Sequence, residues 1–66
     1  MVFSNQVKIV RKRLGISQKE LAVALSVSFA TVNRWENNRV IPSNLAQRSF
    51  FDFCENNFIN ILELQD

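Results

Sequence analysis

Four side chains near the middle of the chain have the chemistry to recognise the edges of base pairs. They are Phe29, Ala30, Asn33 and Arg34, and helical spacing places them on one face. Arginine can donate two parallel hydrogen bonds to guanine, asparagine can pair with adenine, and an apolar side chain can contact the thymine methyl. We expect this face to contact bases. The alternatives are that Phe29 packs against its own domain and that Arg34 contacts only phosphate or solvent.

Polar residues next to this face can contact DNA phosphates. Gln18 falls at an expected helix start, where free N–H groups and the helix dipole favour an anion. Ser17, Ser28 and Thr31 flank the face and are expected to contact the DNA backbone. Lys12, Arg13 and Lys19 are expected to add diffuse attraction. For each of these residues, simple solvation is the competing explanation.

The side chains needed for catalysis or metal binding are missing. The chain has no His, and Cys54 is its one cysteine, so neither a Cys–His pair nor a zinc-binding set can form. One glycine cannot build a glycine-rich phosphate loop. The i, i+3 pair Asp52 and Glu55 is better explained by a solvated helix face than by acid–base catalysis. We therefore expect no enzymatic activity, no cofactor and no metal.

Positioning the recognition face requires two short helices, the first of which starts at Gln18. Ser17 can cap this helix, and Glu20 can reach back to the Ser17 N–H and complete a capping box. The apolar face of this helix consists of Leu21, Ala22 and Leu25. The small Ala22 allows a second backbone to approach closely.

The second helix starts after the break at residues 26–28. Ser28 can cap it, and Val32 and Trp35 lie on its buried side. We expect Val27 to fill the turn and Trp35 to form the floor of the core. An ordinary helical hairpin is the alternative, but the combination of cap, small residue, turn and short polar helix favours a DNA-reading pair.

This pattern resembles the helix-turn-helix family of phage repressors and Cro proteins, also called the xenobiotic-response-element type. The matching residues are Arg11, the run from Leu14 to Gln18, Leu21, Ala22, Leu25, Val27, Val32 and Trp35 to Asn37. The resemblance spans about residues 7–53. It departs at Ser26, where the family usually has glycine. That position often needs a positive φ, which costs a non-glycine residue about 1 kcal/mol.

The resemblance implies roles for particular residues. Family members contact bases from the first two positions of the second helix and from its middle, which here are Phe29, Ala30 and Arg34. The loop after that helix contacts the DNA backbone in the family, which implies the same role for Asn37, Asn38 and Arg39. In relatives the positions of Arg11 and Glu36 form an ion pair. This pair ties a helix that precedes the two described above to the end of the helix that starts after Ser28.

The whole pattern predicts an all-α fold, a compact bundle of four or five helices whose second and third form the helix-turn-helix. We expect the first helix at residues 5–14, with Ser4 as its cap and Gly15 at its end. Asn38 is expected to stop the third helix, and Pro42–Ser43 to start a fourth. The expected apolar face of the fourth helix consists of Leu45, Ala46, Phe50, Phe53 and Cys54.

Length and charge predict one domain with an oriented charge distribution. We expect residues 1–66 to form a single helix-turn-helix domain, with a core at about 4–56 and an apolar, acidic tail at 57–66. Residues 1–51 hold all eight Lys and Arg and two acids, a net charge of +6, whereas residues 52–66 hold four acids and no base, a net charge of −4. The basic part can bind phosphates, and the tail should point away from them.

These observations predict a sequence-specific, double-stranded-DNA-binding transcriptional regulator, a repressor that acts as a homodimer. The expected dimer surface is the apolar tail, around Phe51, Phe58, Ile61 and Leu62, unless this tail folds back and completes a monomer core. The alternative function is a protein-interaction or antitoxin-like module whose tail binds a partner such as a toxin or a larger enzyme. A third alternative is an accessory DNA-binding subunit of a restriction or mobile-element system.

The chain shows no signal for secretion or membrane insertion. Its start, Met1-Val-Phe-Ser, lacks a basic segment and a long apolar run, and no stretch approaches the roughly 20 apolar residues of a membrane span. One cysteine cannot form an intramolecular disulfide. We expect a cytoplasmic protein that associates with the nucleoid when it binds DNA, and no membrane partner.

Overall fold

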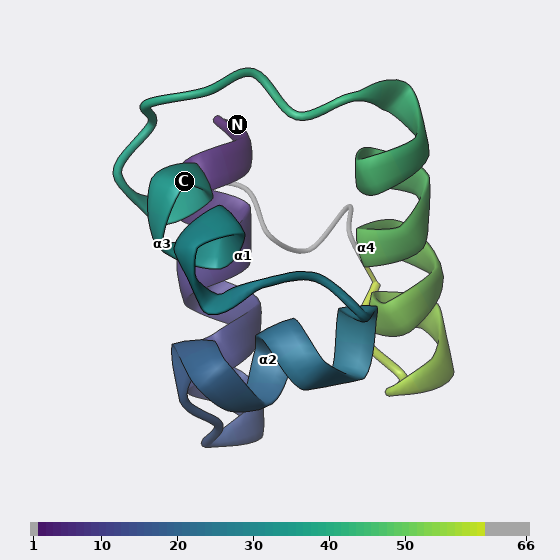
Figure 1. The fold of residues 1–66 in the computed structure, drawn as a ribbon. Helices are drawn as coiled ribbons and strands as arrows, with labels where there is room; N and C mark the ends of the chain where they lie inside the picture. Colours follow the sequence, from purple (N-terminus) through teal and green to yellow (C-terminus); the bar gives the residue numbers. More distant parts are fainter. Residues whose placement is uncertain (1, 61–66) are drawn as a thin grey trace.

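Four helices make up the part of the chain that the computed structural model describes, residues 2–60. They are α1 (Phe3–Leu14), α2 (Gln18–Leu25), α3 (Phe29–Glu36) and α4 (Asn44–Asn56). Figure 1 shows α1 and α4 on opposite sides of the fold, with α2 crossing below them. The predicted all-α fold is confirmed. Residues 57–60 add no fifth helix, and the rest of the expected tail segment lies outside the described residues.

Serine side chains start three of these helices. Ser17, Ser28 and Ser43 each accept a hydrogen bond from the backbone N–H three residues on, at 3.0, 3.1 and 3.1 Å. Ser17 N–H also donates to Glu20 Oε1 at 2.9 Å, which completes the predicted capping box. The boundaries of α2 and α3 are therefore determined by local side-chain chemistry that the sequence displays.

A left-handed residue follows each of the four helices. These residues are Gly15, Ser26, Asn38 and Phe58, with φ of 67°, 57°, 55° and 60°. After α2, for example, Ser26 N–H donates to Val23 O at 3.1 Å and Val27 N–H donates to Ala22 O at 2.9 Å. This pair of hydrogen bonds is the Schellman motif, which satisfies carbonyls that the helix end leaves free. The positive φ predicted at Ser26 is confirmed.

The residue after the left-handed position is apolar and packs against the core at three of the four helix ends. Ile16, Val27 and Ile59 follow three of the four stops and pack against the core, as the apolar residue of a Schellman motif typically does. Arg39 follows the fourth stop and is exposed. The chain therefore returns to the core after α1, α2 and α4, but leaves a cation on the surface after α3.

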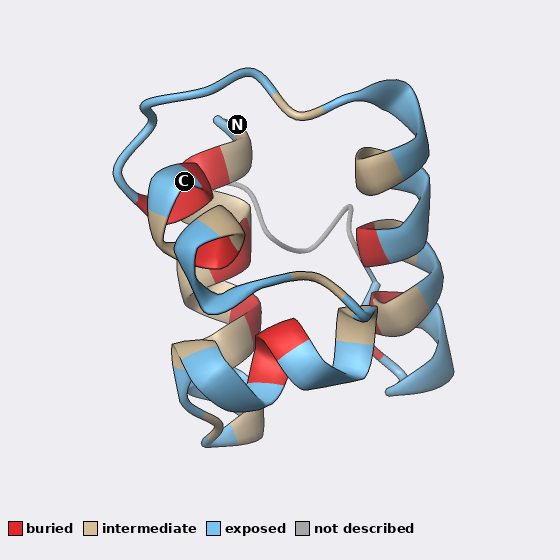
Figure 2. Ribbon diagram, viewed as in Figure 1, coloured by how far each residue is buried: buried red, intermediate tan, exposed pale blue. Residues whose placement is uncertain are grey.

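Aromatic rings join α1, α3 and α4 in the core. Trp35 and Phe50 are buried, and the ring of Phe3 meets both edge-on, with centroid distances of 5.5 and 5.3 Å. Figure 2 shows the buried positions on the sides of the helices that face one another. The remaining fully buried apolar side chains are Val7, Val10, Leu21, Val32 and Cys54.

Two sequence predictions are wrong. The first helix begins at Phe3 with Val2 at the cap position, and Ser4 is buried inside the helix and does not cap it. Extending the helix to Phe3 brings that ring onto Trp35 and Phe50, a gain that a serine cap does not match. Leu45 is 74% exposed and does not face the core, because the inward stripe of α4 runs through Phe50 and Cys54, on another side of the helix.

The helices are short. The longest, α4, has 13 residues, and no helix within residues 2–60 has the length and apolar character needed to cross a bilayer.

We predict that Ser26→Gly stabilises the protein. An L-residue in the left-handed region costs about 1–2 kcal/mol, and the flexibility of glycine in the unfolded chain offsets part of the gain. The net gain of about 0.5–1 kcal/mol should raise Tm by roughly 2–8 °C in thermal unfolding. Gly15→Ala is the matched control and should lower Tm, because alanine is strained at a φ of 67°. No atom lies within 4 Å of the new Cβ, so the backbone conformation is the only feature that opposes alanine there. A lower Tm for Ser26→Gly would contradict this account.

Candidate nucleic-acid interface

Helix α3 has one buried side and one side open to solvent. Val32, Trp35 and Glu36 are buried. Phe29, the first residue of the helix, is 52% exposed, and Ala30 and Arg34 are also exposed. The packing of α3 on α1 and α2 therefore leaves an apolar ring and a guanidinium along the outer side of the helix.

The predicted backbone-contacting residues lie around this face. Ser17 and Ser28 are exposed at the starts of α2 and α3, where each oxygen accepts a capping hydrogen bond. Thr31 is half-buried, and its hydroxyl lies 2.9 Å from the Ser28 hydroxyl. Asn38 and Arg39 are exposed in the loop that follows α3. Helix starts and the following loop thus surround the exposed side of α3 with polar groups.

Three amide side chains connect α2 with α3 across this surface. Asn33 Nδ2 donates to Gln18 Oε1 at 3.2 Å. Asn37 Nδ2 donates to the Asn33 backbone oxygen at 2.8 Å and to Asn33 Oδ1 at 3.2 Å. Sequence reasoning missed this linkage. The i, i+4 spacing of Asn33 and Asn37 was the available signal, but the register of α2 against α3 is needed to place Gln18 beside them.

A bidentate ion pair connects α1 to the end of α3. Arg11 Nε donates to Glu36 Oε2 at 2.8 Å, and Arg11 Nη2 donates to Glu36 Oε1 at 3.1 Å. Arg11 Nη1 also donates to the backbone oxygen of Ile16 at 3.2 Å. These are the two positions that the family resemblance pairs. The Arg11 side chain therefore holds together α1, the turn after it and α3.

The ion pair keeps a buried carboxylate charged. Burial raises the pKa of Glu36, but hydrogen bonds from Arg11 and Gln18, with the charges of Arg11 and Lys8, outweigh it and leave the pKa below its usual value. The hydrogen bond that Arg11 donates to Glu36 is the main reason that the pKa of Arg11 is raised. Both side chains therefore stay ionised at neutral pH.

The thiol of Cys54 is a nucleophile by its residue type, but it is buried. Cys54 is almost fully buried in the core, and this burial raises the pKa of its thiol to about 11. Reactive cysteines need a lowered pKa and an accessible thiolate, and Cys54 has neither at neutral pH. Within residues 2–60, no group of three or more His, Cys, Asp or Glu is placed to hold a metal ion.

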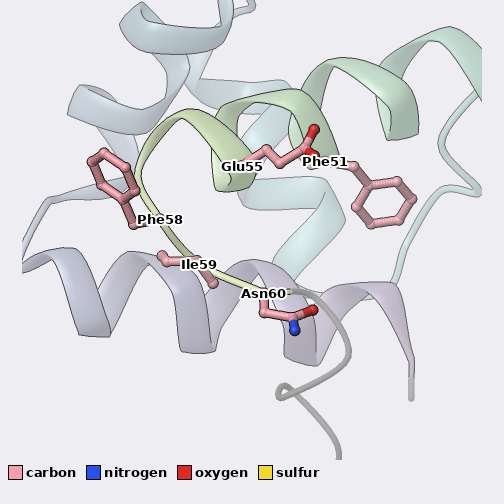
Figure 3. A pocket seen from close by; sticks show the side chains of 5 residues that line it. All are labelled: Phe51, Glu55, Phe58, Ile59 and Asn60. Atoms are coloured by element: carbon pink, nitrogen blue, oxygen red, sulfur yellow. The ribbon is translucent and has the colours of Figure 1, made fainter.

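An open apolar pocket of about 560 Å³ lies at the end of α4, on the side shown in Figure 3. It is lined by Phe51, Glu55, Phe58, Ile59 and Asn60. Phe58 is 97% exposed, whereas Ile59 is buried in the core. The half-buried Phe51 packs against the rings of Phe3 and Phe50, with centroid distances of 6.4 and 5.8 Å.

The four predicted dimer residues thus have different surroundings. Phe58 projects into solvent, whereas Phe51 is partly buried and packs against the core of its own chain. Ile61 and Leu62 lie outside the described residues. The chain does fold back at Ile59, whose N–H donates to Cys54 O at 2.9 Å, so one residue of the segment completes the monomer core.

Comparison with known proteins agrees with this geometry. A family model described as helix-turn-helix matches residues 7–45. The antitoxin HipB of Escherichia coli O6:H1 (strain CFT073) is 35% identical over 52 residues, which cover 79% of this chain and 52% of the relative. The chain therefore spans about half the length of this curated relative. No solved structure matches the chain.

The fold and the exposed α3 place the protein in the class of small all-α DNA-binding domains. Within that class, the chain belongs to the helix-turn-helix family of phage repressor and Cro type. Members of this family are DNA-binding regulators.

We predict that Glu36→Ala strongly destabilises the fold. It leaves the guanidinium of Arg11 without its carboxylate, and the loss should be about 2–3 kcal/mol in denaturant unfolding. It should stay below the roughly 3–5 kcal/mol of a fully buried pair, because the Arg11 side chain is 23% exposed while that of Glu36 is 5% exposed. The control is the double variant Arg11→Met with Glu36→Met, which removes both charges and should recover much of the loss. Unchanged stability of Glu36→Ala would show that the pair contributes nothing.

Proposed function

We propose that this protein binds double-stranded DNA sequence-specifically and regulates transcription as a repressor. The observation that carries the proposal is the two-sided character of α3, which buries Val32, Trp35 and Glu36 and exposes Phe29 and Arg34. A recognition helix needs such an outer face to enter the major groove. The family membership of the chain supports this use of α3.

In the proposed complex, the outer side of α3 contacts bases. Arg34 donates to guanine O6 and N7, and Phe29 and Ala30 contact thymine methyl groups. The starts of α2 and α3 and the loop after α3 contact phosphates, through Ser17, Gln18, Ser28, Thr31, Asn38 and Arg39. These contacts fix the register of the helix on the duplex, and the base contacts provide the sequence preference.

Charge favours one orientation on DNA. The net charge is +6 over residues 1–51 and −4 over residues 52–66. The end of α4 carries exposed Asp52 and Glu55 and would be repelled by phosphates. We therefore place the basic side, with α3, against the DNA and the acidic end of α4 away from it.

We also propose that the protein acts as a homodimer. One recognition helix reads only a few base pairs, and two-fold pairing doubles the contacts on a palindromic operator. Phe58 is the best-placed contact, because its ring is almost fully exposed and its backbone adopts a φ of 60° that phenylalanine rarely tolerates. Strain of this kind often accompanies a functional surface.

The likeness to an antitoxin supports a second candidate function. The relative is named an antitoxin, and it is 35% identical over most of this chain. In this alternative, a toxin or larger enzyme would occupy the apolar pocket beside Phe58 and DNA binding would be secondary. For both candidates we propose a cytoplasmic, non-enzymatic protein.

Selection from a randomised duplex pool at physiological salt tests the DNA-binding proposal. We expect enrichment of an inverted repeat, and we expect Arg34→Ala to lose the preference for one guanine, because one bidentate contact discriminates by about 1–3 kcal/mol. Arg13→Ala is the control: it removes an exposed cation of α1 and should weaken binding slightly without changing any base preference. Enrichment of no sequence, with only weak salt-sensitive binding, would favour the partner-protein alternative.

Sedimentation equilibrium of Phe58→Asp tests the proposed dimer surface. We expect a shift from dimer to monomer. The Phe58→Asp monomer should melt at no lower a temperature than the wild-type monomer, because aspartate accepts a left-handed backbone more readily than phenylalanine. Leu45→Asp is the matched control, since Leu45 is also an exposed apolar residue of the α4 region, at 74%. If Leu45→Asp dissociates the dimer and Phe58→Asp does not, the dimer uses the other end of α4.

A further inference from the structure

The side-chain amides of Asn37, Asn33 and Gln18 form a series in which each amide donates a hydrogen bond to the next one. Asn37 Nδ2 donates to Asn33 Oδ1, and Asn33 Nδ2 donates to Gln18 Oε1, each at 3.2 Å. The Gln18 side chain also helps to lower the pKa of Glu36. A carboxylate only accepts hydrogen bonds, and Oε1 of Gln18 already accepts from Asn33, so the Gln18 NH₂ group is the one that faces Glu36. The hydrogen bonds therefore run from Asn37 through Asn33 to Gln18, whose NH₂ group faces the buried carboxylate.

This direction is fixed by the charge at its end. Arg11 donates hydrogen bonds of 2.8 and 3.1 Å to Glu36 and holds the carboxylate in place. Turning over the amide of Gln18 or Asn33 would place oxygen against oxygen in one contact and NH₂ against NH₂ in the other. Successive hydrogen bonds in a common direction also polarise one another. The orientations of the three amides are thus coupled to the ion pair.

The coupling determines what this surface can offer to DNA. Bidentate recognition of adenine needs both Nδ2 and Oδ1 of an asparagine, and both of these atoms of Asn33 already have partners within the protein. Gln18, in contrast, keeps one Nε2 hydrogen that can be donated to a phosphate at the start of α2.

We propose that Asn33 and Asn37 are positioning residues, which lock the outer side of α3 to α2 and orient the Gln18 amide towards phosphate. This assignment rests on the proposed DNA binding, and it gives base specificity to Phe29, Ala30 and Arg34. Asn33, which its residue type suggests as an adenine reader, acts through Gln18 and makes no base-specific contact.

Base preferences of four variants test this assignment in the full chain. Asn33→Ala, Gln18→Met, the double variant and Arg34→Ala are each profiled against every single-base change in the selected operator, at a temperature where circular dichroism shows them folded. We expect Asn33→Ala to bind about threefold to tenfold more weakly at all sites, with every base preference kept. The double variant should bind no more weakly than Gln18→Met, because both substitutions break the same chain. Arg34→Ala should lose one preference.

Nuclear magnetic resonance of the free protein provides a readout that does not need DNA. We expect Asn33→Ala to shift the side-chain NH₂ resonances of both Gln18 and Asn37, and Arg34→Ala to leave them unchanged. Unchanged Gln18 and Asn37 resonances in Asn33→Ala would overturn the hydrogen-bond chain. Loss of one base preference in Asn33→Ala would overturn the positioning role while leaving the proposed function intact. A wild-type protein that enriches no sequence would overturn the proposed function itself.

Discussion

The carboxylate of Glu36 is the group on which the arrangement of the first three helices depends. It is buried at the end of α3, where an unpaired charge would be costly, so it requires donors from other parts of the chain. Arg11 supplies them from α1 and also donates to Ile16 O in the turn after α1, while Gln18 of α2 helps to lower the pKa of the carboxyl. The carboxylate of Glu36 thus connects α1, α2 and α3 and helps to set the orientation of α3 relative to the other two helices.

Short helices explain why so much of this fold depends on helix ends. Eight residues, the length of α2 and of α3, are too few for an isolated helix to be stable in water. Each of these helices has a serine at its start and a left-handed Schellman stop at its end, so part of the backbone groups that each helix end leaves free find partners nearby. The apolar residue that follows a stop then adds to the core. Helix ends and core packing consequently stabilise the same few residues.

The sequence predicts the parts of this fold that local chemistry determines. Capping serines, the glycine after α1 and the asparagine after α3 are all visible as residue types at particular spacings, and they place α2, α3 and α4 correctly. The start of α1 is different, because Phe3 is recruited by rings of α3 and α4 that are far away in the sequence. The left-handed Phe58 cannot be predicted from its residue type either, since phenylalanine has no preference for that conformation. The amide linkage likewise depends on how α2 lies against α3 and not on either helix alone.

The two ends of the molecule differ in how their side chains meet the solvent. At the α2–α3 end, polar side chains have partners inside the chain, which restricts their motion and suits a surface that must present a fixed pattern to a duplex. At the end of α4, a strained backbone holds the Phe58 ring in solvent beside an open apolar pocket, while the adjacent Ile59 is buried. Because removal of that ring from water would offset the strain, the exposed ring favours association there. This contrast supports the proposed nucleic-acid contact at the α2–α3 end and the proposed protein contact at the end of α4.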